Sequence, residues 1–183
     1  MNLFPFPDRI QSREELKKDV LYNKIPEEDR VHICEMAWRR GVSTAQKILN
    51  KFPKQNIHQI LTGERVKITT VSKDEVCGNI RIFGEFYSTK KEIVIYTESI
   101  AKWASANQLE NRTAEELVLA HEFFHYLECT EIGDTSKEYQ VPAFRIGKIT
   151  IGKSGVRTLS EIAAHGFVRE YFDNKGKTKI LNN

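Results

Sequence analysis

Residues 121–125 read His-Glu-Phe-Phe-His, a His-Glu-x-x-His motif of the kind found on the zinc-binding helices of peptidases. Residues four apart lie on one face of an α-helix, so His121 and His125 can each direct a ring nitrogen to one metal ion. Glu122 lies about 100° further round such a helix, which suits contact with a metal-bound water better than ligation. The motif therefore predicts a zinc site with Glu122 as its catalytic base, although histidines bonded to backbone inside a core would show the same spacing.

A catalytic zinc keeps three protein ligands and one open position, so a third ligand is required. The extended motif with glycine three and histidine six residues after His125 is absent, because those positions hold Glu128 and Glu131. A later predicted helix, residues 158–172, carries Glu161, and we expect this side chain to be the third ligand. The alternative is an exposed glutamate on the surface of that helix.

His165 follows Glu161 by one helical turn and shares its predicted face. It is either a residue that orients a ligand imidazole or a metal ligand itself, and we favour the first because two histidines and a carboxylate already complete a site. A donor that steadies the oxyanion is also needed. Tyr87, Tyr126, Tyr139 and His165 are the candidates, and the sequence does not choose among them.

The metal helix has its own local signals. Thr113 followed by Glu116 forms a capping box, which predicts that the helix begins near Thr113. From Leu117 to Leu127 the segment is apolar nearly all round, a pattern typical of a helix buried in the middle of a domain.

Three segments together resemble a known family. Residues 119–125 read Leu-Ala-His-Glu-Phe-Phe-His, residues 161–168 carry Glu-x-x-Ala-His-x-Phe-Val, and the pair 84–87 and 92–96 reads Gly-Glu-Phe-Tyr and Glu-Ile-Val-Ile-Tyr. They are similar to the corresponding motifs of the ImmA/IrrE family of gluzincin-like zinc metallopeptidases. The resemblance covers roughly residues 45–172, and His165 stands where the family usually has Asn.

The resemblance implies that His121, His125 and Glu161 bind zinc and that Glu122 is the catalytic base. It also makes an intracellular protein, such as a transcriptional regulator cleaved at one bond, a candidate substrate. A function of another class remains open, namely a metal-dependent sensor or regulatory binding protein without turnover. The intact Glu122 favours the peptidase, because a binding site needs no base at that position.

The predicted fold is α+β and zincin-like, with a small mixed sheet, a buried metal helix, a glutamate helix and an N-terminal helical part. One domain is expected for 183 residues, with 1–65 mostly helical and 66–172 as the zincin core. Helices are predicted at 12–22, 26–41, 43–52, 57–61 and 100–109, and strands at 66–71, 78–83, 84–87 and 92–97. The polar strand at 85–87 is expected to form a sheet edge that a peptide can join as a further strand.

Two further segments carry predictions. The long connection 129–159, with a short strand near 146–151, is expected to form part of the substrate wall. Leu3-Phe4-Pro5-Phe6-Pro7 reads as an extended arm, whose phenylalanines are expected to dock on this domain or on a partner.

Composition excludes several classes of function. The net charge of +3 is spread along the chain without a basic block, so nucleic-acid binding is not expected. Three cysteines without close pairs argue against disulfides and cysteine-bound zinc, and fit a reducing cytoplasm. The first residues show no apolar run with a basic lead and no run approaches 18 apolar residues, so neither a signal peptide nor a membrane span is expected. It does not indicate an oligomeric state.

Overall fold

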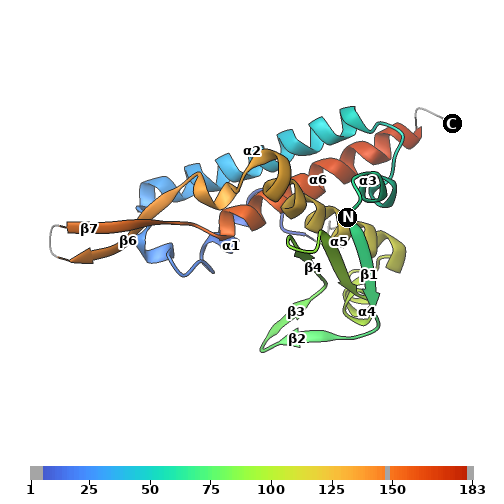
Figure 1. Ribbon diagram of the computed structural model, residues 1–183, viewed down its shortest axis with the longest axis horizontal. Helices are drawn as coiled ribbons and strands as arrows, with labels where there is room; N and C mark the ends of the chain where they lie inside the picture. Colours follow the sequence, from blue (N-terminus) through green and yellow to red (C-terminus); the bar gives the residue numbers. More distant parts are fainter. Residues whose placement is uncertain (1–5, 147–148, 181–183) are drawn as a thin grey trace.

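The computed structural model describes residues 6–146 and 149–180, and it is a mixed α+β fold with small sheets. Figure 1 shows two long helices, α2 (Glu27–Lys51) and α6 (Thr158–Ile180), running side by side along the long axis. The sheet and α4 (Thr97–Ala106) form a second part beneath them. Helix α5 (Asn111–Leu127) contacts α6, α4 and the sheet, so the predicted metal helix joins the two parts.

The main sheet has three strands in the order β1 (Lys67–Val71), β5 (Glu92–Tyr96), β4 (Gly84–Tyr87). β1 pairs with β5 in parallel and β4 pairs with β5 antiparallel, which confirms the predicted mixed sheet. β4 lies at the edge, as its polar sequence predicted, while the central strand buries Ile93 and Ile95. The turn at 88–91 joins β4 to β5 as expected.

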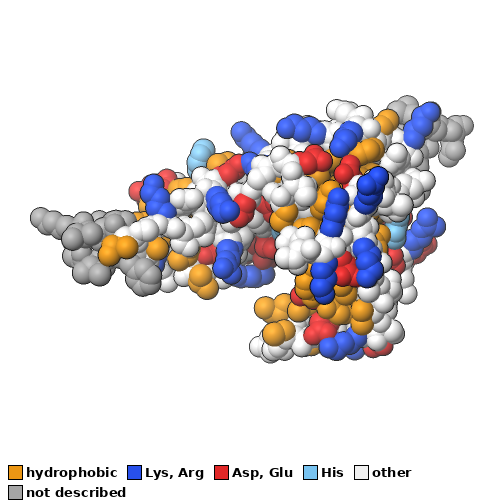
Figure 2. All heavy atoms as spheres, in the orientation of Figure 1, with side chains coloured by type: hydrophobic (Ala, Val, Ile, Leu, Met, Phe, Trp, Pro, Cys, Tyr) orange, Lys and Arg blue, Asp and Glu red, His pale blue; other side chains and the backbone are white. Residues whose placement is uncertain are grey.

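A small hairpin precedes the edge strand. It consists of β2 (Glu75–Cys77) and β3 (Ile80–Ile82), so the strand predicted for 78–83 is present but shorter, and its partner β2 was not predicted. Gly78 has a φ of +60° and forms the turn, a conformation that glycine adopts without steric cost. Figure 2 shows hydrophobic side chains gathered on this hairpin, where Val76 and Ile80 are exposed.

Helix α2 is continuous where two helices were predicted, at 26–41 and 43–52. Gly41 does not end the helix, because it faces the backbone of α6. A Cβ atom at Gly41 would lie 1.9 Å from the Ala163 carbonyl oxygen, so only glycine allows this approach. Thr44 continues this helix and donates its hydroxyl to the Arg40 carbonyl (2.8 Å).

Helix α5 begins at Asn111, and the predicted capping box at Thr113 is wrong. Glu110 is extended, no side chain caps the first turn, and the Ala114 amide already bonds to the Glu110 carbonyl (3.0 Å). The helix therefore begins before Thr113, and a backbone hydrogen bond rather than a capping side chain closes its first turn.

The connection 129–159 is more regular than predicted. A π-helical turn (Glu128–Ile132) and a 3-10 turn (Thr135–Lys137) lead into a hairpin of β6 (Gln140–Ile146) and β7 (Ile149–Gly155). Figure 1 shows this hairpin reaching away from the main sheet, and none of its described residues lines the cavity described below. Its strands pair with each other rather than with the edge strand, and its role in the substrate wall stays a prediction.

The N-terminal part contains α1 (Ser12–Leu16), which is shorter than the predicted 12–22, and α3 (Ile57–Gly63), near the predicted 57–61. Between α1 and α2 lies one 3-10 turn, Tyr22–Lys24. The core is formed by apolar side chains of α2, α5, α6 and β5, including Ile33, Phe123, Phe167 and Ile95. Among the described residues, no helix has both the length and the apolar composition needed to cross a membrane.

Candidate metal centre

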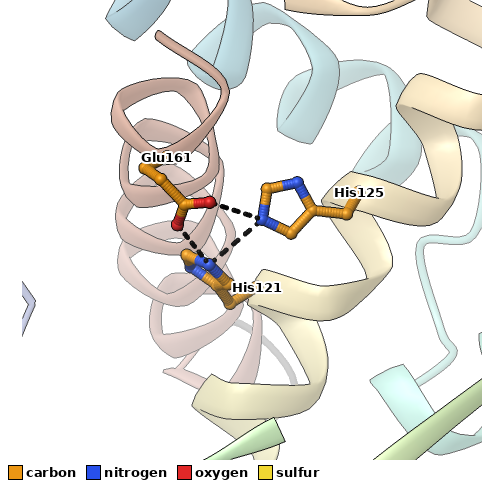
Figure 3. Close-up of side chains that lie close together, drawn as sticks. All are labelled: His121, His125 and Glu161. Atoms are coloured by element: carbon orange, nitrogen blue, oxygen red, sulfur yellow. Dashed lines mark hydrogen bonds and ion pairs between the residues drawn. The ribbon is translucent and has the colours of Figure 1, made fainter. Parts of the chain in front are cut away.

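Three side chains from two helices converge on one point (Figure 3). His121 and His125 extend from α5, and Glu161 extends from the first turn of α6. His121 Nε2 lies 3.2 Å from both Glu161 Oε2 and His125 Nε2, and His125 Nε2 lies 3.6 Å from Glu161 Oε1. Two ligands bound tetrahedrally at zinc distances of 2.0–2.1 Å are about 3.4 Å apart. The three donors therefore fit a tetrahedral metal ion that keeps its fourth position open.

The place of Glu161 depends on how closely α6 packs on α2. Gly41 and Gly166 remove side chains from the contact, since a Cβ at Gly166 would lie 2.6 Å from the Trp38 carbonyl oxygen. The first turn of α6 then lies opposite the histidines of α5. The Asp19 carboxylate accepts hydrogen bonds from the Thr158 amide (3.0 Å) and hydroxyl (3.1 Å), which holds the start of the helix.

Glu128 is a site residue that the sequence prediction missed. Its Oε2 accepts from His125 Nδ1 (3.0 Å), while its Oε1 accepts from the Thr135 amide and the Ser160 hydroxyl (2.9 Å each). A proton held on His125 Nδ1 leaves Nε2 with its lone pair towards Glu161 and His121, as a metal ligand requires. The signal was present, because a carboxylate three residues after a helical histidine lies on the same face.

The charges within this cluster shift the pKa values of its members. Burial lowers the pKa of His125, but the hydrogen bond to Glu128 and the nearby carboxylates outweigh it and raise the value to about 9. Burial raises the pKa of Glu161, yet the hydrogen bond and charge of His121 bring it well below its usual range. About half of the Glu161 side chain is exposed (49%), so its contacts with the histidines, rather than enclosure, set its ionisation. An anionic Glu161 is the form that binds a cation.

Glu122 lies beside these ligands and close to the edge strand. It is buried, and this burial raises the pKa of its carboxyl above the usual value. A Cβ at Gly84 would lie 3.2 Å from Glu122 Cγ and 2.8 Å from Val118 Cγ1, so glycine is required where β4 passes over α5. Glu122 is thus held between the metal helix and the strand that a peptide would join.

A cavity of about 640 Å³ opens onto the cluster. Its volume is within the usual range for ligand sites. Its walls include the four residues predicted to carry the chemistry, His121, Glu122, His125 and Glu161, together with His165. Apolar side chains of the wall come from the hairpin, the edge strand and the residue between them, from α4 and α5, and from the N-terminal arm: Ile80, Ile82, Phe83, Phe86, Trp103, Val118, Phe6 and Pro7.

The structure does not bring the three candidate tyrosines to this cavity. Tyr87 is exposed and donates to Glu85 (3.1 Å), while Tyr126 is buried and donates to Glu64 (3.3 Å). Tyr139 donates to Asp29 (2.6 Å), and burial followed by that bond raises its pKa to about 12. All three hydroxyls are committed elsewhere, so none is placed to steady an oxyanion.

His165 is the remaining candidate, and it lines the cavity without joining the three ligands. Its ring centroid is 5.5 Å from that of His121. Burial and the neighbouring His121 lower its pKa to about 3, which keeps the imidazole neutral at physiological pH. Within the described residues, the buried Nδ1 atoms of His165 and His121 have no hydrogen-bond partner. His165 therefore contributes a neutral imidazole ring to the cavity wall.

In comparisons with known proteins, no family model, no curated protein and no solved structure shows a significant match to this chain.

Proposed function

We propose that this chain is a zinc metallopeptidase with a zincin-like fold, related to the ImmA/IrrE family, and that it hydrolyses a peptide bond in a protein substrate. The observation that carries the proposal is the convergence of His121, His125 and Glu161 with Glu122 beside them. The chemistry of the donor set supports zinc, because two imidazoles and one carboxylate at these spacings suit a catalytic site.

Zinc bound by the two histidines and Glu161 would polarise the carbonyl group of the scissile peptide bond and lower the pKa of a bound water. Glu122 accepts the proton of the attacking water and passes it to the leaving amine. Its contact with Gly84 of the edge strand supports this role, because a peptide added along β4 would pass close to Glu122. His165 provides a neutral imidazole in the cavity wall next to His121, with ring centroids 5.5 Å apart.

The edge strand positions the substrate in this proposal. β4 pairs with β5 on one side only, so its other side offers backbone groups for an added strand. Phe86 contributes to the same wall as Glu122 and His121, so a peptide paired there runs past the metal centre. This arrangement fits an extended segment of a protein better than a compact small molecule.

The test compares the parent chain with Glu122→Gln. We expect both proteins to bind about one zinc ion, because Glu122 is not one of the three converging donors. The parent should cleave members of a peptide library digested from a cell proteome, as read by mass spectrometry. Glu122→Gln should cleave them at least a hundredfold more slowly, the scale of general acid–base catalysis.

Two results would overturn the proposal. One is a parent protein that neither retains nor takes up zinc in elemental analysis. The other is a Glu122→Gln protein that matches the parent in cleavage. A parent that binds zinc fully and cleaves nothing would replace the peptidase proposal with the sensor function.

A further inference from the structure

The N-terminal arm enters the candidate active-site cavity. The Phe6 ring is stacked on the ring of His121, with centroids 5.7 Å apart and planes inclined by 12°. It also meets Trp103 edge-on (5.3 Å, 74°) and His165 at a tilt (5.4 Å, 50°). Phe6 packs on the domain, as predicted for the arm, whereas Leu3–Pro5 lie outside the described residues.

The surroundings of Phe6 form a slot of aromatic character. Trp103 on α4 packs on Phe83 (5.2 Å) and forms the apolar wall, while the two imidazoles form the wall nearest the metal centre. Offset-stacked and edge-to-face contacts are the arrangements that aromatic rings prefer. A slot of this shape, in contact with a metal-ligand ring, suits a side chain that lies next to the reacting bond.

The chain after Phe6 is anchored to the domain. The Asp8 carboxylate accepts from the amides of Ile10 and Gln11 (2.8 Å each), and the guanidinium groups of Arg9 and Arg13 pair with Glu35 on α2. Phe6 is therefore only two residues from a fixed turn. A side chain tethered so closely is present at its slot at a high effective concentration.

We propose that the slot between Trp103, His121 and His165 is a subsite for a large aromatic side chain of the substrate, and that Phe6 fills it as an intramolecular competitor. The slot holds an aromatic ring in the structure, and its position beside His121 and the edge strand places it within reach of a bound peptide. The inference rests on the proposed function for the identity of its ligand. It names the substrate as a segment with an aromatic residue next to the cleaved bond.

The test measures binding rather than turnover. Full-length protein carrying Glu122→Gln is titrated with acetyl-Ala-Phe-Ala-amide and with acetyl-Ala-Ala-Ala-amide, with and without the additional substitution Phe6→Ala. Removing the competitor raises the fraction of protein able to bind, so the Kd for the phenylalanine peptide should fall about tenfold. The alanine peptide should bind weakly to both. Phe52→Ala, which removes a partly buried ring outside the cavity, is the matched control and should leave both Kd values unchanged.

A second measurement asks whether Phe6 occupies the slot in solution. The chain has two tryptophans, and Trp38 is buried in the core, so quenching by acrylamide reports mainly on Trp103. Phe6→Ala should make Trp103 more accessible to acrylamide, while Phe52→Ala should not. Thermal melts establish that each variant is folded.

The proposal is overturned if Phe6→Ala leaves the Kd of the phenylalanine peptide unchanged, if that peptide binds no better than the alanine peptide, or if quenching of Trp103 does not rise. These readouts do not depend on cleavage. If the protein binds the aromatic peptide but cleaves nothing, the peptidase proposal is refuted and the subsite proposal stands. If it cleaves peptides without preferring aromatic residues, the subsite proposal is refuted and the peptidase proposal stands.

Discussion

Replacing Glu128 by glutamine tests how the metal centre is oriented, because the two carboxylate oxygens have different partners. Oε1 accepts from the Thr135 amide and the Ser160 hydroxyl, and Oε2 accepts from His125 Nδ1. The glutamine of Glu128→Gln has one acceptor oxygen and one donor amide. Keeping the oxygen towards Thr135 and Ser160 preserves two hydrogen bonds, so the new NH₂ group should face His125.

That orientation changes the tautomer of His125. An NH₂ group opposite Nδ1 requires Nδ1 to accept, which moves the ring proton to Nε2, the atom that points to His121 and Glu161. Zinc could then bind His125 Nε2 only if this proton left the ring, and otherwise His125 would not serve as a ligand. Loss of such a supporting contact usually costs 10–100-fold in metal affinity, so we expect zinc binding to weaken by about 1.4–2.8 kcal/mol.

The assay is zinc competition against a chelator of known affinity, with the metal-free melting temperature measured alongside to separate affinity from folding. The matched control is Glu131→Gln, an exposed glutamate on the same π-helical turn whose nearest cation is Lys51 at 3.7 Å. ¹⁵N chemical shifts of the metal-free imidazole report its tautomer when they are recorded above the raised pKa of His125, about 9, where the ring is neutral. Equal zinc affinity for Glu128→Gln and Glu131→Gln, with an unchanged tautomer, would refute the assignment of Glu128 as the residue that orients His125.

Three further predictions concern other parts of the chain. Glu161→Ala should weaken zinc binding in the same competition assay by far more than Glu110→Ala, an exposed glutamate, and equal losses would remove Glu161 from the ligand set. Gly41→Ala should lower the free energy of unfolding by about 3 kcal/mol in urea titrations, because its Cβ would overlap the α6 backbone, whereas Gly63→Ala has open space and should change little. Burial raises the pKa of the Cys34 thiol to about 11, so at pH 8 a disulfide reagent should label only the two exposed cysteines until the protein is unfolded. Rapid labelling of all three thiols in the folded protein would contradict that burial.

The residues with local signals were the ones that sequence reasoning could place. The spacing of His121 and His125 follows from helix geometry, and Glu161 shares its helical face with His165, so a shared site was predictable from periodicity. The edge strand was predictable because its polar residues suit one-sided pairing.

The errors came from residues whose partners are distant in the chain. In the sequence, Gly41 indicates the end of a helix. In the structure, the helix continues through Gly41, and glycine is needed there because the backbone of α6 lies against it. Three tyrosines looked equally able to serve as donors, because nothing local shows that Tyr126 bonds to Glu64 or that Tyr139 bonds to Asp29. The connection 129–159 was expected to be mostly irregular, because the strand character of β6 comes from its pairing with β7.

The packing of α6 against α2 has a consequence for the order in which the protein matures. The ribosome releases the histidines of α5 before Glu161, and α6 can take its place only by packing on a helix made much earlier. Such non-local contacts form late, because the intervening chain must be ordered first. A nascent chain therefore presents only part of the donor set, and metal binding at the proposed site would wait until α6 is docked. Binding energy gained at that moment becomes folding energy, so zinc would stabilise the finished chain rather than its intermediates.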